Sequence, residues 1–543
     1  MASMNSSLFY AFLTAFACIF LAAIPCSVLI LMRAYKLRPM DRMFASAIPM
    51  LTALLGIEAF LNIYRAPWFG WNGIRLSRTF AIYRGGNMYP GQNAMGAIIG
   101  TDHTPMSHFL YWPATFAPTP AMAVWIGATI SMALVIAPLI WLFCIDKPGR
   151  RLYSFYALLA CLFMLLRGGR YSGLLQIPFI IHTDAAAICF STLAGALLFR
   201  SRSNAGWRTL LLSSLFAVLS VASKQTMAPV LLANLLFLLI ADGAGSFRRY
   251  LACLALCGGA VAAFLVLRFW PLRDFLFNVV TLATHRPPAT SPTVIFLEAL
   301  TDSAVESSPA IFCLLAFVLY TYVYERRSLG NWRDLFANQR WLIFPLSGIL
   351  LAPVCIKAEM LGGDNNHIGL FSYFFVLGAT LGLKGFMNEE LIPRRATGSK
   401  LLAGILIAMT FAGVVDAIQE NMTSLHHANA KPEDTIAYQY GLRHPGKTYF
   451  PVNPLAEYYT VHHFYDVDFA LVDRERTGYP VSQAQLAAGI PTGITSVAFA
   501  CSQPCLPSLT MQEYLKGWQQ VSDPELPGFM VFESPSTELQ PAQ

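Results

Sequence analysis

The sequence predicts a mainly α-helical membrane protein, a polytopic bundle of about 12 spans followed by a small soluble domain. The 543 residues are 56% hydrophobic and only 12% charged, which is too apolar for a water-soluble chain of this length. Hydrophobic runs recur at lengths that cross about 30 Å of hydrocarbon with some tilt or thinning. Basic residues crowd alternate connections between these runs, as one face of a membrane requires. The predicted spans are 8–32, 43–63, 122–144, 152–167, 184–200, 209–223, 226–241, 250–268, 309–324, 341–356, 367–387 and 400–417.

The basic connections give the chain an orientation. Six alternate connections hold 20 of the 37 Lys and Arg in 66 residues, against seven acids. The first span is too long, and too closely followed by basic residues, for a cleaved signal peptide, so we interpret it as a retained helix. By the positive-inside rule its N-terminus lies outside, and the other connections and the tail face outward. We expect a multi-pass protein of a bacterial inner membrane.

The chain divides into a transmembrane module, 1–417, and a soluble extracytoplasmic domain, 418–543. The module contains a long first outward loop at 64–121 and a second interfacial cap at 269–308. The amphipathic stretch 71–83 of the first loop is typical of a segment that lies along the membrane interface.

The tail alternates apolar and polar residues in short runs such as 496–500, which favours a small α/β or α+β domain. It carries 6 basic and 13 acidic residues from 418 onward, which argues against nucleic-acid binding. Nine of the eleven cysteines lie in or beside spans, where Cys is a small buried hydrophobe, and they indicate no metal site. Cys501 and Cys505 of the tail are a candidate disulfide in an oxidising compartment.

Ionisable groups on the outward side are the candidates for chemistry, because charges at membrane depth are costly. Glu58 closes an apolar run, and desolvation there would make its carboxylate a stronger base; the alternative is a pair with Arg65. Lys224 joins two apolar runs with almost no loop. Its ammonium needs an anion, either a neighbouring carboxylate or the phosphate of a lipid-linked ligand.

A polar run, Gly362-Gly-Asp-Asn-Asn-His367, precedes the predicted span 367–387. Its glycines permit a tight turn, and one Asn is enough to cap the following helix. The excess of polar residues indicates hydrogen bonding to a ligand. Elsewhere the sequence contains no P-loop, GxGxxG, GxSxG or HExxH motif.

Several motifs in order along residues 43–417 resemble the GT-C class of integral-membrane glycosyltransferases, which take a sugar from a polyprenyl-phosphate donor. An acid ends an early span, and Tyr83-Arg-Gly-Gly-Asn-Met-Tyr-Pro90 is similar to the G-G-x-x-Y-P stretch of the family's first loop. Thr104-Pro-Met-Ser-His-Phe-Leu-Tyr-Trp-Pro113 is similar to its entry into the next span. His182-Thr-Asp184, Lys224-Gln-Thr226 and Gly362-Gly-Asp-Asn-Asn366 complete the set.

The resemblance implies roles for individual residues. Glu58 matches the family's catalytic carboxylate, which is usually Asp; Asp102 is the second candidate, and Asp184 matches an acid that organises the acceptor site or a metal. The donor phosphate is expected to contact Lys224, Arg167, Arg170, Arg268 and Arg273. The substrates are expected to contact Tyr89, His103, His182, Gln225, Asp364, Asn365, Asn366 and His367.

The implied function is transfer of a hexosyl or pentosyl group from a polyprenyl-phosphate sugar to a glycan, lipid or protein hydroxyl on the extracytoplasmic face, with inversion. The residue types require no cofactor, and a divalent cation is compatible with them. Transport or flipping of lipid-linked saccharides, or their polymerisation, is the alternative. A transporter is expected to carry charged or Gly/Pro-broken segments at the bilayer midplane, whereas the ionisable groups here gather at one edge.

Overall fold

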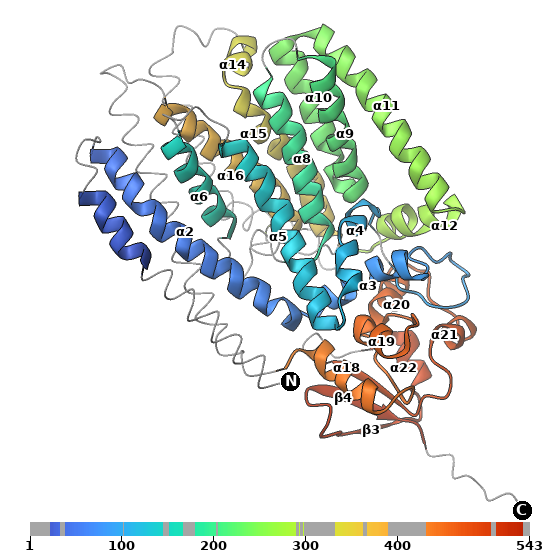
Figure 1. Cartoon of the computed structure of the whole chain (residues 1–543). Helices are drawn as coiled ribbons and strands as arrows, with labels where there is room; N and C mark the ends of the chain where they lie inside the picture. Colours follow the sequence, from blue (N-terminus) through green and yellow to red (C-terminus); the bar gives the residue numbers. More distant parts are fainter. Residues whose placement is uncertain are drawn as a thin grey trace, which may run out of the picture.

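The computed structural model describes most of the chain as one helical bundle with a small α+β domain at one end (Figure 1). The described residues are 22–32, 39–100, 103–144, 151–166, 180–201, 205–288, 293, 297, 332–361, 366–388, 431–500 and 507–535.

Six helices in these described ranges are long and apolar enough to cross a membrane. Each covers a predicted span closely, because long apolar runs bounded by polar residues leave little choice of register. They correspond to α2 (Pro39–Arg65), α5 (Pro120–Cys144), α8 (Thr183–Arg200), α10 (Ala228–Asp242), α11 (Ala244–Arg268) and α15 (Ile343–Met360). The spans of α10 and α15 also include the 3-10 turns before them and run over Gln225–Asp242 and Arg340–Met360.

Four shorter apolar stretches accompany them in the described part of the chain: Ala22–Met32, Ser154–Leu165 within α6 (Arg151–Leu166), α9 (Trp207–Ser223), and His367–Gly382 within α16 (Asn366–Asn388). The predicted spans 309–324 and 400–417 lie outside the described residues. The total of about 12 spans therefore stays a prediction.

Small residues allow the bundle helices to approach one another closely. A Cβ on Gly378 of α16 would lie 2.5 Å from Cδ of Pro345 on α15, and one on Gly195 of α8 would lie 2.9 Å from the Phe344 ring. Small residues at such contacts let helix backbones pack by van der Waals contact in an apolar solvent. The described helices α8, α9, α10, α15 and α16 therefore enclose one continuous apolar core.

A buried ion pair fixes the end of the bundle that the charge pattern predicts to be cytoplasmic. Arg340 of η6 (Arg340–Leu342), after α14 (Trp332–Asn338), donates to both carboxylate oxygens of Asp242 at 2.8 and 3.1 Å. The same guanidinium donates to the Leu198 carbonyl and the Ser201 hydroxyl, both at 3.1 Å. It thus ties the ends of α8 and α10 together.

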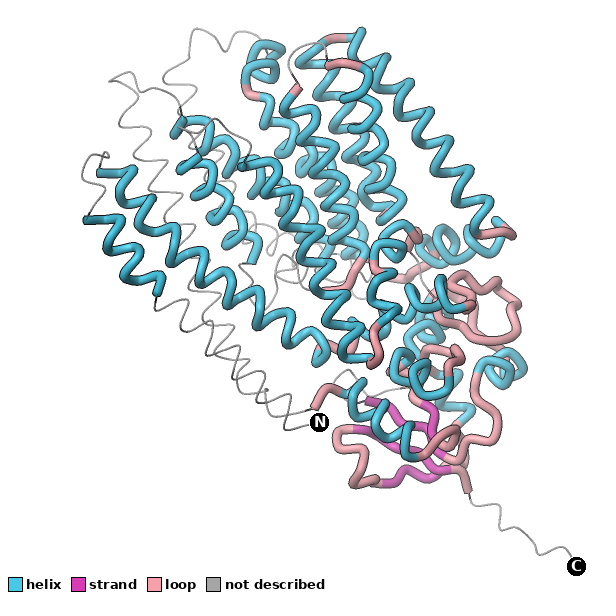
Figure 2. Tube along the Cα trace, in the orientation of Figure 1, coloured by secondary structure: helices cyan, strands magenta, loops and turns pink. Residues whose placement is uncertain are grey.

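The C-terminal region forms a mixed sheet packed with short helices, at the lower right of Figure 2. The strand order among the described residues is β1-β2-β4-β3, with β1 parallel to β2 and the other neighbours antiparallel. The strands are β1 (Thr448–Tyr449), β2 (Ser496–Ala500), β3 (Gln519–Val521) and β4 (Phe529–Glu533). The helices are α18 (Glu433–Arg443), α19 (Pro454–Val461), α20 (Asp468–Arg476), α21 (Gln483–Gly489) and α22 (Leu509–Tyr514).

The first outward loop lies between this domain and the bundle (Figure 1). It contains η1 (Ala66–Trp68), α3 (Trp71–Arg84), α4 (Met106–Leu110) and η2 (Trp112–Phe116). Helix α3 is buried on most of its surface, including Asn72 and Arg78, so protein rather than lipid covers most of it. Its apolar face packs against the C-terminal domain as well as α5, and all three share one core. The expectation that 71–83 lies along the membrane interface stays a prediction.

The second cap continues from α11 into α12 (Leu272–Leu276) and the π-helical turn η5 (Phe277–Leu282). Phe275 and Val279 pack against Met88 and Tyr89 of the first loop. Trp270 remains 76% exposed on the other side. An exposed Trp beside a membrane span is typical of an interfacial anchor, which is consistent with the predicted position of this cap. The interfacial position itself stays a prediction.

Candidate functional site

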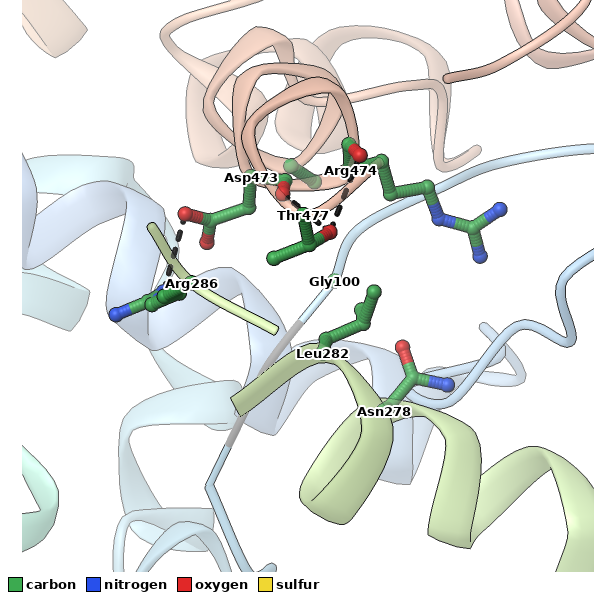
Figure 3. A pocket seen from close by; sticks show the side chains of 8 residues that line it. Gly100, Asn278, Leu282, Arg286, Asp473, Arg474 and Thr477 are labelled. Carbon is green, nitrogen blue, oxygen red and sulfur yellow. Dashed lines mark hydrogen bonds and ion pairs between the residues drawn. The ribbon is translucent and has the colours of Figure 1, made fainter. Parts of the chain in front are cut away.

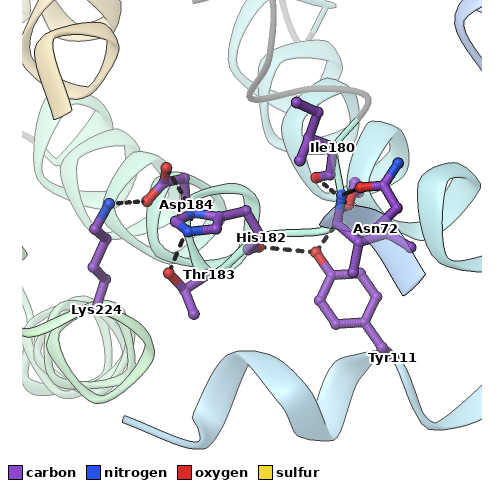
Figure 4. Close-up of polar contacts among 9 residues, drawn as sticks. Asn72, Tyr111, Ile180, His182, Thr183, Asp184 and Lys224 are labelled. Atoms are coloured by element: carbon purple, nitrogen blue, oxygen red, sulfur yellow. Dashed lines mark hydrogen bonds and ion pairs between the residues drawn. The ribbon is translucent and has the colours of Figure 1, made fainter. Parts of the chain in front are cut away.

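A buried cluster of charged and polar groups lies where α8 begins and α9 ends (Figure 4). Nζ of Lys224 lies 2.5 Å from Oδ1 of Asp184, and Nδ1 of His182 lies 2.8 Å from Oδ2 of the same carboxylate. Lys224 is 0% and Asp184 1% exposed. Both carboxylate oxygens of Asp184 are thus engaged, one by an ammonium and one by an imidazole.

Local sequence explains why these three side chains face one another. α9 ends at Ser223, and Lys224 takes an extended conformation before the short η4 (Gln225–Met227), which turns the chain into α10. His182 is likewise extended and precedes α8, whose first turn contains Asp184. A carboxylate in a first turn is stabilised by the free N–H groups of the helix end. Two helix ends therefore bring opposite charges together.

Hydrogen bonds from other elements hold the segment before α8 in place. Tyr111 donates to the carbonyl of His182 at 3.0 Å and pairs with the Ser131 hydroxyl at 2.8 Å. Ser131 donates to the Ile180 carbonyl at 3.0 Å, and Asn72 accepts from the Ile181 N–H at 2.9 Å. Burial raises the pKa of Tyr111 to about 12, so its hydroxyl stays a donor at neutral pH.

Further histidines surround the Asp184–Lys224 pair. The rings of His103 and His182 meet edge to face with centroids 5.3 Å apart. His108 on α4 is 4% exposed, and burial, reinforced by nearby Arg78, holds its pKa well below the usual range. Burial also lowers the pKa of His182, so its neutral ring donates Nδ1–H to Asp184. His367, in the first turn of α16, lies within electrostatic reach of Lys224 and Asp184.

Several predicted substrate residues therefore belong to one region. Tyr89 joins it by donating its hydroxyl to the His103 carbonyl at 2.7 Å. Gln225 follows Lys224 in the chain, and its Oε1 is buried. Asn366 is the first residue of α16, immediately before His367. Of the two anions that the sequence left open for Lys224, the structure supplies the carboxylate.

Among the described residues, no hydrogen bond or ion pair joins the predicted phosphate-binding residues Arg268 and Arg273 to Lys224, so the shared phosphate site stays a prediction. Arg268 is exposed, donates to the Ile82 carbonyl at 3.1 Å and lies over the Phe269 ring. Arg273 is exposed on α12. Glu58 is fully buried on α2, where Asn62 donates to its Oε1 at 2.6 Å.

Seven predicted residues lie outside the described ranges: Asp102, Arg167, Arg170, Asp364, Asn365, Cys501 and Cys505.

Sequence reasoning missed the groups that orient the cluster. Tyr111 and His108 lie in the motif 104–113, but the motif does not predict that their side chains lie near residue 182. Ser131 carried a usable signal, because it is a polar residue inside the apolar span of α5. Arg78 was not selected, because its segment 71–83 was expected to lie along the membrane interface.

The cluster does not fit a divalent cation at Asp184. A metal ion would have to displace the Lys224 ammonium or the His182 imidazole from the carboxylate. Among the residues described, no group of three or more His, Cys, Asp and Glu is arranged to hold a metal ion.

No family model and no curated protein sequence matches this chain. Among solved structures, the archaeal oligosaccharyltransferase AglB from Archaeoglobus fulgidus, in complex with an inhibitory peptide and a dolichol-phosphate, is 11% identical. The match covers 90% of this chain and 74% of that chain with a TM-score of 0.40.

Two crystal structures of the Archaeoglobus fulgidus oligosaccharyltransferase are also similar. The complex with Zn and sulfate is 11% identical, with 82% of this chain and 68% of that chain covered and a TM-score of 0.39. The apo form is 12% identical, with 82% and 69% covered and a TM-score of 0.38. Identities and TM-scores at this level are too low to assign a function.

Proposed function

We propose that this protein is a membrane glycosyltransferase that moves a sugar from a polyprenyl-phosphate donor to a hydroxyl of a glycan, lipid or protein acceptor. The reaction takes place on the extracytoplasmic face of a bacterial inner membrane and inverts the anomeric carbon. The observation that carries the proposal is the buried Lys224–Asp184–His182 cluster. It lies at the end of the bundle covered by the first loop and the C-terminal domain, beside motif residues from four separate segments.

The chemistry requires a base, an oriented acceptor and charge stabilisation at the leaving phosphate. A carboxylate takes the proton of the acceptor hydroxyl, whose oxygen attacks the anomeric carbon from the face opposite the phosphate. The carbon–oxygen bond to the phosphate breaks, and its electron pair leaves with the polyprenyl phosphate. Glu58 and Asp102 are the proposed bases, since both oxygens of Asp184 are already engaged.

Asp184 and His182 are proposed to orient the acceptor rather than to accept its proton. A neutral imidazole that donates Nδ1–H to a carboxylate is fixed in one tautomer and one orientation. Its second nitrogen is then an acceptor for a hydroxyl of a substrate. Lys224 fixes the carboxylate and supplies positive charge near the proposed phosphate site.

Transfer from a labelled polyprenyl-phosphate sugar, measured in membranes, tests the proposal. D184N and H182A are expected to lose transfer, and so is whichever of E58Q and D102N removes the base. D242N is the matched control, because it breaks a buried ion pair of the same kind at the other end of the bundle. It is expected to lower stability without a selective loss of turnover.

Two results would contradict the proposal. Movement of the lipid-linked sugar across the membrane without covalent transfer would make the protein a transporter. Full transfer by E58Q, D184N and H182A would refute the site assignment.

A further inference from the structure

We infer that Arg474 of the C-terminal domain is a positioning residue for the Asp184 cluster, acting through the loop 85–100 of the first outward region. This inference rests on the proposed function. It gives the C-terminal domain a part in the reaction without a direct contact to substrate.

Arg474 is buried against backbone. Among the described residues, Asp466 lies within electrostatic reach of its guanidinium but forms no ion pair with it. Arg474 is 2% exposed, and its guanidinium donates to the carbonyls of Pro90, Gly91 and Gln92 at 2.9, 3.0 and 3.2 Å. Its charge lies over the ring of Phe277 at 5.3 Å. Burying an arginine is costly, and here the compensation comes from carbonyls of one irregular loop. The guanidinium therefore fixes the path of that loop.

Other groups hold the same loop from both sides. Asn278 of η5 donates to the Pro90 carbonyl at 2.9 Å. Asn278 and Arg474 line one small pocket, and in Figure 3 the Asn278 amide and the Arg474 guanidinium extend to the same side. Gln485 of α21 donates to the carbonyls of Gln92 and Ala94, both at 3.1 Å.

The far end of the loop is held as well. Asp466 accepts from the Ile98 N–H at 2.7 Å, and the Val467 N–H donates to the Ile98 carbonyl at 3.0 Å. The loop is thus bound to the C-terminal domain at residues 90–94 and at residue 98.

A continuous series of contacts leads from the loop to the cluster. Tyr89 precedes Pro90, and its ring packs edge to face on Phe275 with centroids 5.0 Å apart. Its hydroxyl donates to the His103 carbonyl at 2.7 Å. The His103 ring meets the His182 ring, which is bonded to Asp184. A shift of Pro90 therefore moves the backbone of His103, next to the bound imidazole.

The domain is also docked by contacts that do not involve Arg474. Tyr459 donates to the Ala117 carbonyl at 2.6 Å, and Trp71 packs on Phe469 with centroids 4.4 Å apart. The shared apolar core joins the first loop, α5 and the C-terminal domain. Loss of the guanidinium is therefore expected to loosen the loop without releasing the domain.

The test compares R474M with R476M in the full-length protein. Arg476 lies on the same helix but is exposed, so it controls for loss of charge. R474M is expected to lower kcat about 100-fold, as for a small misplacement of reacting groups. KM should change little, and the thermal midpoint should fall because three carbonyls lose their donor. R476M should match the wild type, and R474K should recover part of kcat.

Two further measurements separate positioning from a structural role. Amide hydrogen exchange at residues 89–98 should rise in R474M and stay unchanged in R476M. Because Arg474 is inferred to act through Tyr89, R474M/Y89F should lose no more kcat than R474M alone.

Three results would overturn the inference. They are a lower thermal midpoint in R474M with kcat intact, no rise of amide exchange at 89–98, and a kcat in R474M/Y89F that is lower than in R474M alone. If the wild type transfers no sugar, the proposed function fails, and the exchange comparison still decides whether Arg474 fixes the loop.

Discussion

The pairing of Lys224 with Asp184 makes a quantitative prediction about charge in the bundle. Lys224 is 0% exposed, its ammonium lies 2.5 Å from the carboxylate, and Asp184 is 1% exposed. K224M keeps an unbranched side chain that is one atom shorter, and it leaves the buried carboxylate without its ammonium. Removing one partner of such a pair costs about 3–5 kcal/mol. D184N, which leaves the ammonium buried, is expected to be similarly destabilising.

The double variant D184N/K224M removes both charges and should recover most of that stability. The coupling energy, which is the sum of the two single losses minus the double loss, should therefore exceed either single loss of about 3–5 kcal/mol. Thermal unfolding in detergent measures the cycle, and transfer from the labelled donor is assayed on the same preparations. The stable double variant should remain inactive, because the charge and the bond to His182 are needed for chemistry. Additive losses of stability would refute the pairing, and full activity in the double variant would refute its role.

Three other variants test the first loop and the C-terminal domain. Burial raises the pKa of Glu457 to about 8 and that of Asp466 to about 7, above the unfolded value of about 4. In their protonated form these groups stabilise the folded domain, fully below about pH 4, and this contribution is lost as pH rises through 7–8. Thermal stability should therefore fall between pH 5 and pH 8. The fall should be less steep in E457Q, which cannot ionise at this position. G73A would place a Cβ 2.0 Å from Oδ2 of Asp434, so the carboxylate has to turn away from Asn453, which donates to its Oδ1 at 2.8 Å, or α3 and α18 have to move apart. Limited proteolysis should then release the tail faster than in wild type. Y111F removes a buried hydroxyl that bridges two elements and should cost about 1–3 kcal/mol in thermal unfolding; no loss would mean that the bridge is replaced.

The spans were largely predictable because each is encoded locally. The predicted helix 184–200 is observed as Thr183–Arg200, and 209–223 as Trp207–Ser223. The shared core of the first loop and the tail was not predictable in the same way. Its contacts join residues far apart, such as Ile98 and Asp466, which are 368 positions apart and leave no local pattern. An amphipathic stretch such as 71–83 shows that one face is buried, but the stretch alone does not identify the partner.

The site was predictable in its residue types and less so in its pairings. Sequence reasoning singled out His182, Asp184 and Lys224, because charged residues at helix ends of a membrane bundle are unusual. It left the anion for Lys224 open, because carboxylate and phosphate satisfy an ammonium equally well. Tyr111 was not selected, because its part is to hold the His182 carbonyl, and such a role depends on the tertiary fold.

The described bundle contains a buried ion pair near each end, and the difference between them supports a functional role for one. The Arg340–Asp242 pair is completed by a helix-end carbonyl and a Ser hydroxyl, which satisfies the guanidinium and ties α8 to α10. That arrangement is sufficient for a structural role. The Lys224–Asp184 pair is instead bonded to His182, with His103 and His367 close by, under a loop held by the C-terminal domain. Stabilising two helix ends does not require this many titratable groups. The excess is expected where a substrate must be oriented and a proton moved.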